Sequence, residues 1–253
     1  MFSFLRQKRA KQPVDVVVNT ASDVFPYLYW ADTRQVRFHL PPAMLCTQPA
    51  LGYANGHPFV QALDSGAAAL RRFYAGYQPT DLAAAYHLDR RWRLGEDLPP
   101  WEVPWMMLRA RLPPKGEHGL DPAHGFALYG PVTEQKVALE MSRLESVATS
   151  IAKRGYDPTM DGGIQGQFLA KGDRLVFFVK GGKHRTAALV HSGRSHIPVT
   201  VRQTWAPVVN AADVQRWPLV LAGTIDPAVA TEVMSAYLPE PAASDTGASL
   251  CAR

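Results

Sequence analysis

The stretch LVFFVKGGKHRTAALVHSG, residues 175–193, constrains the fold more than any other part of the chain. Its apolar run ends at Gly181-Gly182, and a helical pattern follows over about Lys183 to His191, with Gly193 at its C-terminal cap. Upstream, IQGQFLA and RLVFFVK flank a turn at Lys171-Gly172-Asp173, which predicts a β-hairpin. We therefore expect a hairpin that ends in a tight glycine turn and enters a helix directly.

That turn carries positive charge at an unfavourable place. Lys180, Lys183, His184 and Arg185 surround the start of the helix, where the helix dipole favours an anion and repels cations. Glycines let a backbone approach a ligand closely, and the first-turn amides have no internal acceptor. The pattern indicates an anion or phosphate site, although its spacing matches neither GxxxxGK[ST] nor GxGxxG. The alternative is that these cations face solvent or pair with acids elsewhere.

The elements around the turn predict an α+β domain over residues 131–237. A long helix should start at a Thr133 N-cap and end at Gly155, with an apolar stripe at Val137, Met141, Leu144, Val147, Ala148 and Ile151. HIPVTVRQ indicates a strand after the glycine turn. AADVQRWPLV and DPAVATEVMSAYL indicate two further helices, the second starting at Asp226-Pro227.

Residues 15–130 differ in composition from the second region, because they are rich in proline and aromatic residues. The pattern predicts one helix near Pro58–Tyr77 and a short helix in QPTDLAAAYHL capped by Thr80 or Asp81. DLPPWEVPWMML is typical of a loop. We expect this region to pack against the α+β domain and to bind a substrate or partner, with a basic flexible tail at 1–14 and a disordered tail at 238–253.

The second region resembles the ParB/sulfiredoxin-like superfamily over roughly residues 131–205. The resemblance is carried by Ser150-Ile151 with Gly155, by GKHRTAA at 182–188, by Gly193 and by Ile197-Pro198-Val199, which occur in that family's order and spacing. It implies a ParB-like fold that grips ATP or CTP by its phosphates, with Mg²⁺. Carried over, the grip comprises Gly182, His184 and Arg185, joined by Gly181, Lys183 and Thr186.

Two departures from the family pattern bear on which activity we expect. Sulfiredoxins have their catalytic cysteine where this chain has Lys183, so sulfiredoxin activity is not expected. The second nucleotide-contacting box and the helix-turn-helix region of the partition proteins have no counterpart here, so chromosome partition is not expected either.

Other residues are candidates for the rest of a site. Phosphoryl transfer needs an acid, and Asp161, next to Gly162-Gly163, is the predicted catalytic and metal-binding carboxylate, with His184 as its catalytic partner. Its alternative role is a simple turn. Glu140 and Arg143, one helical turn apart, are interpreted as a surface pair, and Glu145 as a surface residue. The remaining candidates for substrate contacts, each equally open to a structural role, are His57, Asp121, His124 and the Arg/Trp cluster HLDRRWRL.

Charge and composition leave two classes of function. The net charge is +5, but Arg6, Lys8, Arg9 and Lys11 supply four of these charges, and the remainder, at +1, disfavours nucleic acid as the partner. The two cysteines predict no disulfide framework, and the absence of an export signal or transmembrane run predicts a cytoplasmic protein. One hypothesis is a nucleotide-dependent phosphotransferase or hydrolase acting on a small or sugar-like substrate. The other is a non-catalytic, nucleotide-sensing or nucleic-acid-interacting adaptor.

Overall fold

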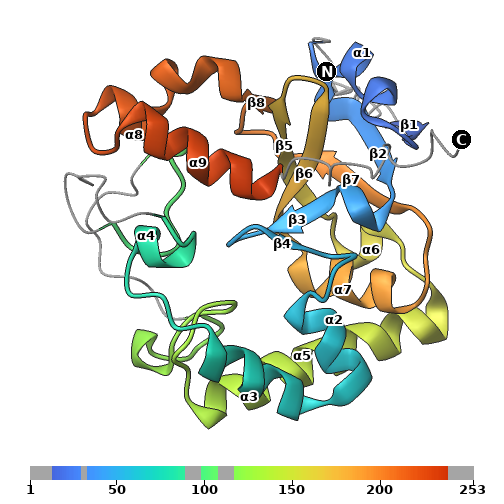
Figure 1. Cartoon of the computed structure of the whole chain (residues 1–253). Coiled ribbons are helices and arrows are strands. Elements are labelled where there is room, and N and C mark those ends of the chain that lie inside the picture. Colours follow the sequence, from blue (N-terminus) through green and yellow to red (C-terminus); the bar gives the residue numbers. More distant parts are fainter. Residues whose placement is uncertain (1–12, 30–32, 89–97, 108–116, 239–253) are drawn as a thin grey trace, which may run out of the picture.

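The computed structural model describes residues 13–29, 33–88, 98–107 and 117–238, and a mixed eight-stranded sheet lies at its centre (Figure 1). The strand order is β1-β2-β7-β5-β6-β3-β4, and β8 also pairs with β5. The strands are β1 (Val14–Val17), β2 (Val36–Leu40), β3 (Leu45–Thr47), β4 (Leu51–Gly52), β5 (Gln165–Lys171), β6 (Arg174–Gly181), β7 (Ile197–Val201) and β8 (Val208–Asn210). The fold is therefore mixed α/β, as the α+β pattern predicts at this coarse level.

The apolar run before the glycine turn is explained by burial of both faces of the sheet. Phe168 and Phe177 belong to one hydrophobic core, while their neighbours Leu169 and Phe178 belong to a second core. Successive side chains of a strand point to opposite faces, so the central residues of β5 and β6, Phe168–Ala170 and Leu175–Val179, are apolar at consecutive positions. The sheet thus divides two cores.

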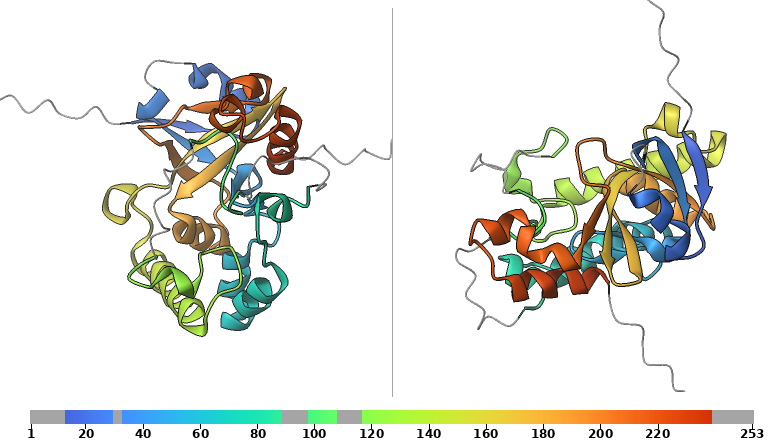
Figure 2. Two further views of the ribbon diagram at one scale, coloured as in Figure 1. Left: turned by 90° about the vertical axis from the view of Figure 1, so that its left-hand side faces the viewer. Right: turned by 90° about the horizontal axis from the view of Figure 1, so that it is seen from above.

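Helices cover both faces. One group, α2 (Pro58–Ser65), α3 (Ala67–Gly76), α5 (Glu134–Arg154) and α7 (Lys183–His191), packs together below the sheet in Figure 1 and again in Figure 2. The second core is completed by α4 (Leu82–Ala85), α8 (Pro218–Leu221) and α9 (Pro227–Tyr237). Two short helices, α1 (Phe25–Leu28) and α6 (Pro158–Asp161), and 3₁₀ turns complete the structure.

Most of the predicted elements of the second region are confirmed. The hairpin β5–β6, the helix α7 and the strand β7 occur where the pattern places them. Thr133 and Asp226 cap α5 and α9 by accepting from Lys136 N and Ala228 N. The predicted helix in AADVQRWPLV is instead a 3₁₀ helix, Ala211–Arg216, followed by α8, because the chain is extended at Trp217.

The prediction of one helix over Pro58–Tyr77 is wrong. Gly66, with φ 72° and ψ −170°, ends α2 and turns the chain into α3. The apolar spacing continues across this break, so periodicity alone did not reveal it. The short helix of QPTDLAAAYHL is α4, and Asp81 rather than Thr80 caps it.

The sheet draws its strands from both sides of residue 130. β2 pairs with β7 in antiparallel fashion, and β3 pairs with β6 in parallel. The N-terminal region therefore packs against the second region through shared backbone hydrogen bonds as well as side chains. Residues 1–12 and 239–253, most of each expected tail, lie outside the described residues. In the described ranges, no helix has the length and apolar character needed to cross a membrane.

Candidate anion-binding site

The glycine turn before α7 lies against the loop that enters β5. A Cβ on Gly182, whose φ is 87°, would come within 3.1 Å of the Ile164 side chain. A Cβ on Gly162 would come within 2.6 Å of Arg185 Nη1. Both residues have positive φ, which favours glycine, and at Gly182 the backbone of Gly163 and Ile164 also leaves little room for a side chain. The expected approach of the Asp161 loop to the glycine turn is confirmed.

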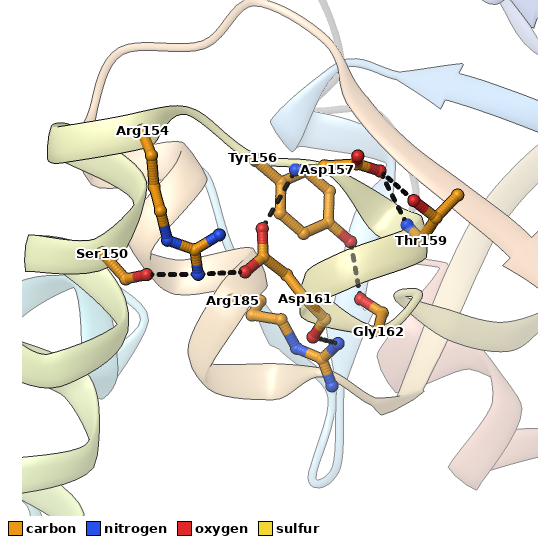
Figure 3. Close-up of polar contacts among 8 residues, drawn as sticks. All are labelled: Ser150, Arg154, Tyr156, Asp157, Thr159, Asp161, Gly162 and Arg185. Carbon is orange, nitrogen blue, oxygen red and sulfur yellow. Dashed lines mark hydrogen bonds and ion pairs between the residues drawn. The ribbon is translucent and has the colours of Figure 1, made fainter.

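Asp161 reaches the turn through its main chain and not through its carboxylate (Figure 3). Arg185 donates to the Asp161 carbonyl oxygen at 2.5 Å. One carboxylate oxygen of Asp161 pairs with Arg154 at 2.6 Å, and the other accepts from the Asp157 amide at 3.0 Å. The Asp157 amide, followed by Arg154, lowers the pKa of this carboxyl. Both oxygens already have partners, so this carboxylate is poorly suited to hold a resident Mg²⁺.

A pocket of about 250 Å³ opens beside the start of α7. Gly182, Lys183 and His184 of the turn line it together with Lys180 at the end of β6. Its other walls come from α5, through Glu140 and Arg143, and from the loop after residue 116, through Glu117, His118 and Ala127. Three segments that are distant in the sequence thus converge on the predicted turn.

Three of the lining residues, Glu117, Glu140 and His184, belong to a chain of alternating charges that runs through Lys136. Lys136 and Glu140, both fully buried, form an ion pair of 2.7 Å one turn apart on α5. Lys136 also donates to Glu117 at 2.7 Å. Glu140 in turn contacts His184 Nε2 at 2.6 Å, and the His184 side chain is only 13 % exposed. The interpretation of Glu140 and Arg143 as a surface pair is therefore wrong.

Glu140 stays ionised in spite of its burial. Burial by itself raises the pKa of a carboxyl group, but hydrogen bonds and charges from His184 and Lys136 outweigh it and lower the pKa to about 2. Because the carboxylate is charged, the ring nitrogen facing it must carry a proton. His184 is thus held with hydrogen on Nε2.

Two cations that line the pocket lack a direct partner within the described part of the chain. Lys183 and Arg143 are both half-buried, and among the described residues neither makes a hydrogen bond or an ion pair. Burial, opposed by Glu117 and Glu140, lowers the pKa of Lys183. Lys180, by contrast, donates to Gln48 Oε1 at 2.8 Å. Unpaired cations at the start of a helix form a site for an anion.

An aromatic stack fixes the position of His184. Its ring lies on Phe59 with centroids 4.7 Å apart, and Phe59 contacts His57, which stacks on Tyr53 at 4.2 Å. His57 is buried and caps α2 by accepting from Phe59 N. The role of His57 is therefore structural, and it is connected to the pocket through Phe59, which stacks on His184.

The other predicted residues do not line the pocket. Arg185 is turned to Asp161, and Thr186 is buried and donates to the Gly182 carbonyl. Asp121 caps a 3₁₀ turn, His124 contacts Thr133 Oγ1 at 2.8 Å, and Glu145 is exposed on α5. Most of HLDRRWRL lies outside the described residues. Among those that are described, no group of three or more His, Cys, Asp and Glu side chains is arranged for a metal.

Three residues of α5 that line or support the pocket were not predicted as site residues, although the sequence carries one indication of their position. Lys136, Glu140 and Arg143 repeat the helical spacing of Val137, Met141 and Leu144, one position earlier. Their face is thus rotated by about 100° from the apolar stripe, close enough to be half covered when α5 packs. A charged row beside an apolar row could have indicated a lined pocket.

Comparison with known proteins adds no relative. No family model matches the chain, and a search of curated proteins finds no match. The ParB-like motifs are consequently a resemblance.

Proposed function

We propose that the pocket at the start of α7 binds the phosphates of a nucleotide, and that the protein is a nucleotide-dependent phosphotransferase or hydrolase. The observation that carries the proposal is the pair of uncompensated cations, Arg143 and Lys183, which line one pocket beside the first turn of a nine-residue helix. In an empty site these two charges repel each other and the helix dipole. A bound phosphate would offset both costs.

The balance of charge points to a multiply charged anion. Four cations surround or underlie the pocket: Lys136, Arg143, Lys180 and Lys183. Two carboxylates, those of Glu117 and Glu140, oppose them, and both are already engaged by Lys136. Two positive charges are left over, which fits a phosphate dianion or a pyrophosphate. The volume of about 250 Å³ suits phosphoryl groups better than a whole nucleotide.

The nucleotide itself comes from the ParB-like resemblance, which implies ATP or CTP. The resemblance assigns the phosphate contacts to Gly181, Gly182, Lys183 and His184. Because Nε2 of His184 is engaged by Glu140, we propose that the Gly181-Gly182 backbone and Lys183 supply these contacts, and that His184 does not. Arg185 would act differently from the family expectation, because it holds the Asp161 loop in place. We likewise propose that the acceptor is a small or sugar-like molecule.

One observation favours the alternative, a nucleotide-sensing or nucleic-acid-interacting adaptor without catalysis. The acids nearest the turn, Asp161, Glu117 and Glu140, are all paired with cations. Phosphoryl transfer usually employs a free carboxylate for Mg²⁺ or for the attacking hydroxyl. Catalysis would therefore depend on His184, which lines the pocket.

A thermal-shift experiment tests the phosphate site. Inorganic phosphate, pyrophosphate, ATP, CTP and GTP are compared, each with and without Mg²⁺. A ligand at about 100 times its dissociation constant adds roughly 2.7 kcal/mol of stability. We expect a shift with at least one nucleotide and with pyrophosphate, and its absence with every anion would refute the site.

Matched variants assign the shift to the pocket. Arg143→Gln and Lys183→Gln should each reduce the affinity at least tenfold, because each removes a charge-assisted hydrogen bond. Lys153→Gln removes an exposed cation from the same helix α5 and should leave the affinity unchanged. Equal effects of all three substitutions would mean that only the overall charge of the protein matters.

A further inference from the structure

The imidazole of His184 is constrained on two sides and open on a third. Phe59 covers one face of the ring, and the Glu140 carboxylate takes the Nε2 edge at 2.6 Å. Nδ1 makes no hydrogen bond to any described residue, and His184 is one of the residues that line the pocket. The nitrogen left for a ligand is therefore Nδ1.

The structure also fixes which form that nitrogen takes. Because ionised Glu140 requires hydrogen on Nε2, neutral His184 must present a lone pair at Nδ1. Lys136 holds Glu140 from the opposite side, and Glu117, which also accepts from the Ala127 amide at 2.7 Å, holds Lys136. A base oriented by a carboxylate, beside a pocket with spare positive charge, is the arrangement of general-base catalysis.

From this geometry we infer that His184 Nδ1 accepts the proton of a hydroxyl or water nucleophile, and that Glu140, held by Lys136, is the positioning residue that makes it able to do so. The inference rests on the proposed phosphoryl site. The hydroxyl oxygen forms a bond to phosphorus while its proton passes to Nδ1. The bond from phosphorus to the leaving phosphate oxygen breaks, and that oxygen keeps the electron pair. The resulting imidazolium is stabilised by the Glu140 carboxylate.

Several charged groups surround the His184 ring. From α5 the ring meets Glu140, which pairs with Lys136, and Arg143 of the same helix lines the pocket. Lys180, Lys183, Glu117 and His118 line the pocket as well. The proton-acceptor role requires the neutral ring, with its lone pair at Nδ1.

The first test needs no turnover. In the full-length protein, ¹⁵N spectra of the histidine rings, with the His184 signals assigned by their loss in His184→Gln, report which nitrogen carries hydrogen. We expect the Nε2–H tautomer at neutral or higher pH and a change at Nδ1 when pyrophosphate is added. The Nδ1–H tautomer would overturn the inference.

The second test is the turnover of ATP and CTP. His184→Gln should lower kcat by about 100-fold or more while nucleotide-induced thermal shifts persist. Glu140→Gln should lower kcat with little change in KM, and it should weaken the preference of His184 for the Nε2–H tautomer in the ¹⁵N spectra, because the ring loses its carboxylate acceptor. A structural role alone would lower activity without changing that tautomer. If nucleotides bind to the native protein and are not turned over, the proton-acceptor role is refuted and the phosphate site stands. If they do not bind, the proposed function itself fails.

Discussion

At the scale of single residues, the ion pair of Lys136 and Glu140 on α5 should be sensitive to substitution. Both side chains are fully buried. Removing one partner of such a pair leaves an uncompensated charge, which typically costs about 3–5 kcal/mol. Glu140→Ala should therefore destabilise the protein by this amount, measured as the free energy of unfolding in urea.

Glu145→Ala is the matched control, because Glu145 is exposed on the same helix. Its effect should stay within about 0.5 kcal/mol. The double substitution of Lys136→Met and Glu140→Leu removes both charges and should recover much of the lost stability, since apolar replacements of buried pairs are often neutral or better. Similar losses in the double and single variants would contradict the assignment of the cost to buried Lys136, which in Glu140→Ala keeps only the partly exposed Glu117 as a partner.

A second prediction at this scale concerns the contribution of His57 to the free energy of unfolding at acid pH. Burial, followed by the charges of Lys183 and His184, lowers the pKa of His57 to about 3. The unfolded chain binds a proton near pH 6.5, so below that pH unfolding is favoured increasingly until the folded form is protonated near pH 3. The contribution of His57 to stability should fall by roughly 2 kcal/mol between pH 7 and pH 5.

The contribution of His57 can be isolated by measuring the free energy of unfolding of the native protein and of a variant at several pH values. His57→Asn can keep the cap on α2 without titrating, so its unfolding free energy should be flatter between pH 7 and 5 than that of the native protein. An unchanged slope in His57→Asn would mean that other groups cause the acid lability.

At the scale of elements, Gly66 shows why a continuous helix was predicted and not found. The apolar residues Leu63, Ala67 and Leu70 continue in helical register through it. Its φ of 72° with ψ of −170° lies in a region that is essentially restricted to glycine, where other residues suffer a strain of about 1–3 kcal/mol. Gly66→Ala should destabilise the protein by that amount.

Gly76 provides the control for this prediction. It is the last residue of α3, it is not among the glycines with positive φ, and no atom lies within 4 Å of the position that its Cβ would take. Gly76→Ala should be neutral or stabilise by up to about 1 kcal/mol, because alanine is the better helix former. Thermal or urea unfolding of the two variants should thus give opposite signs, and equal signs would contradict the strain at Gly66.

The same contrast shows what could be predicted at the level of elements. The hairpin β5–β6, the turn at Gly181-Gly182 and α7 are local in sequence, and their residues alone specify them. The pocket is not local, because Glu117, Glu140 and His184 meet only after α5 packs on α7. A lone His-Arg pair after a glycine turn could indicate an anion site. Nothing in the turn itself could show that Arg185 faces Asp161 and that Arg143 lines the pocket in its place.

At the scale of the whole molecule, the two regions are expected to unfold as one unit. β2 of the first region contributes Phe38, which packs edge to face on Phe168 of β5 with ring centroids 5.1 Å apart. β3 pairs with β6, whose Phe177 and Phe178 face the two different cores. A chain limited to residues 131–253 would lose the strands that flank β7 and β6 and would expose these aromatic side chains.

Unfolding in urea, followed by far-ultraviolet circular dichroism and by tryptophan fluorescence, should give coincident transitions for the full chain. The expected reporters of the second core include Trp105 of the first region and Trp217 of the second, whose rings lie 5.6 Å apart. Phe38→Ala, placed in the other core, should lower both midpoints together, by about 3–5 kcal/mol of stability. The fragment 131–253 should show no cooperative transition. Two separate transitions in the full chain, or a folded fragment, would mean that the sheet joins two bodies that are each stable alone.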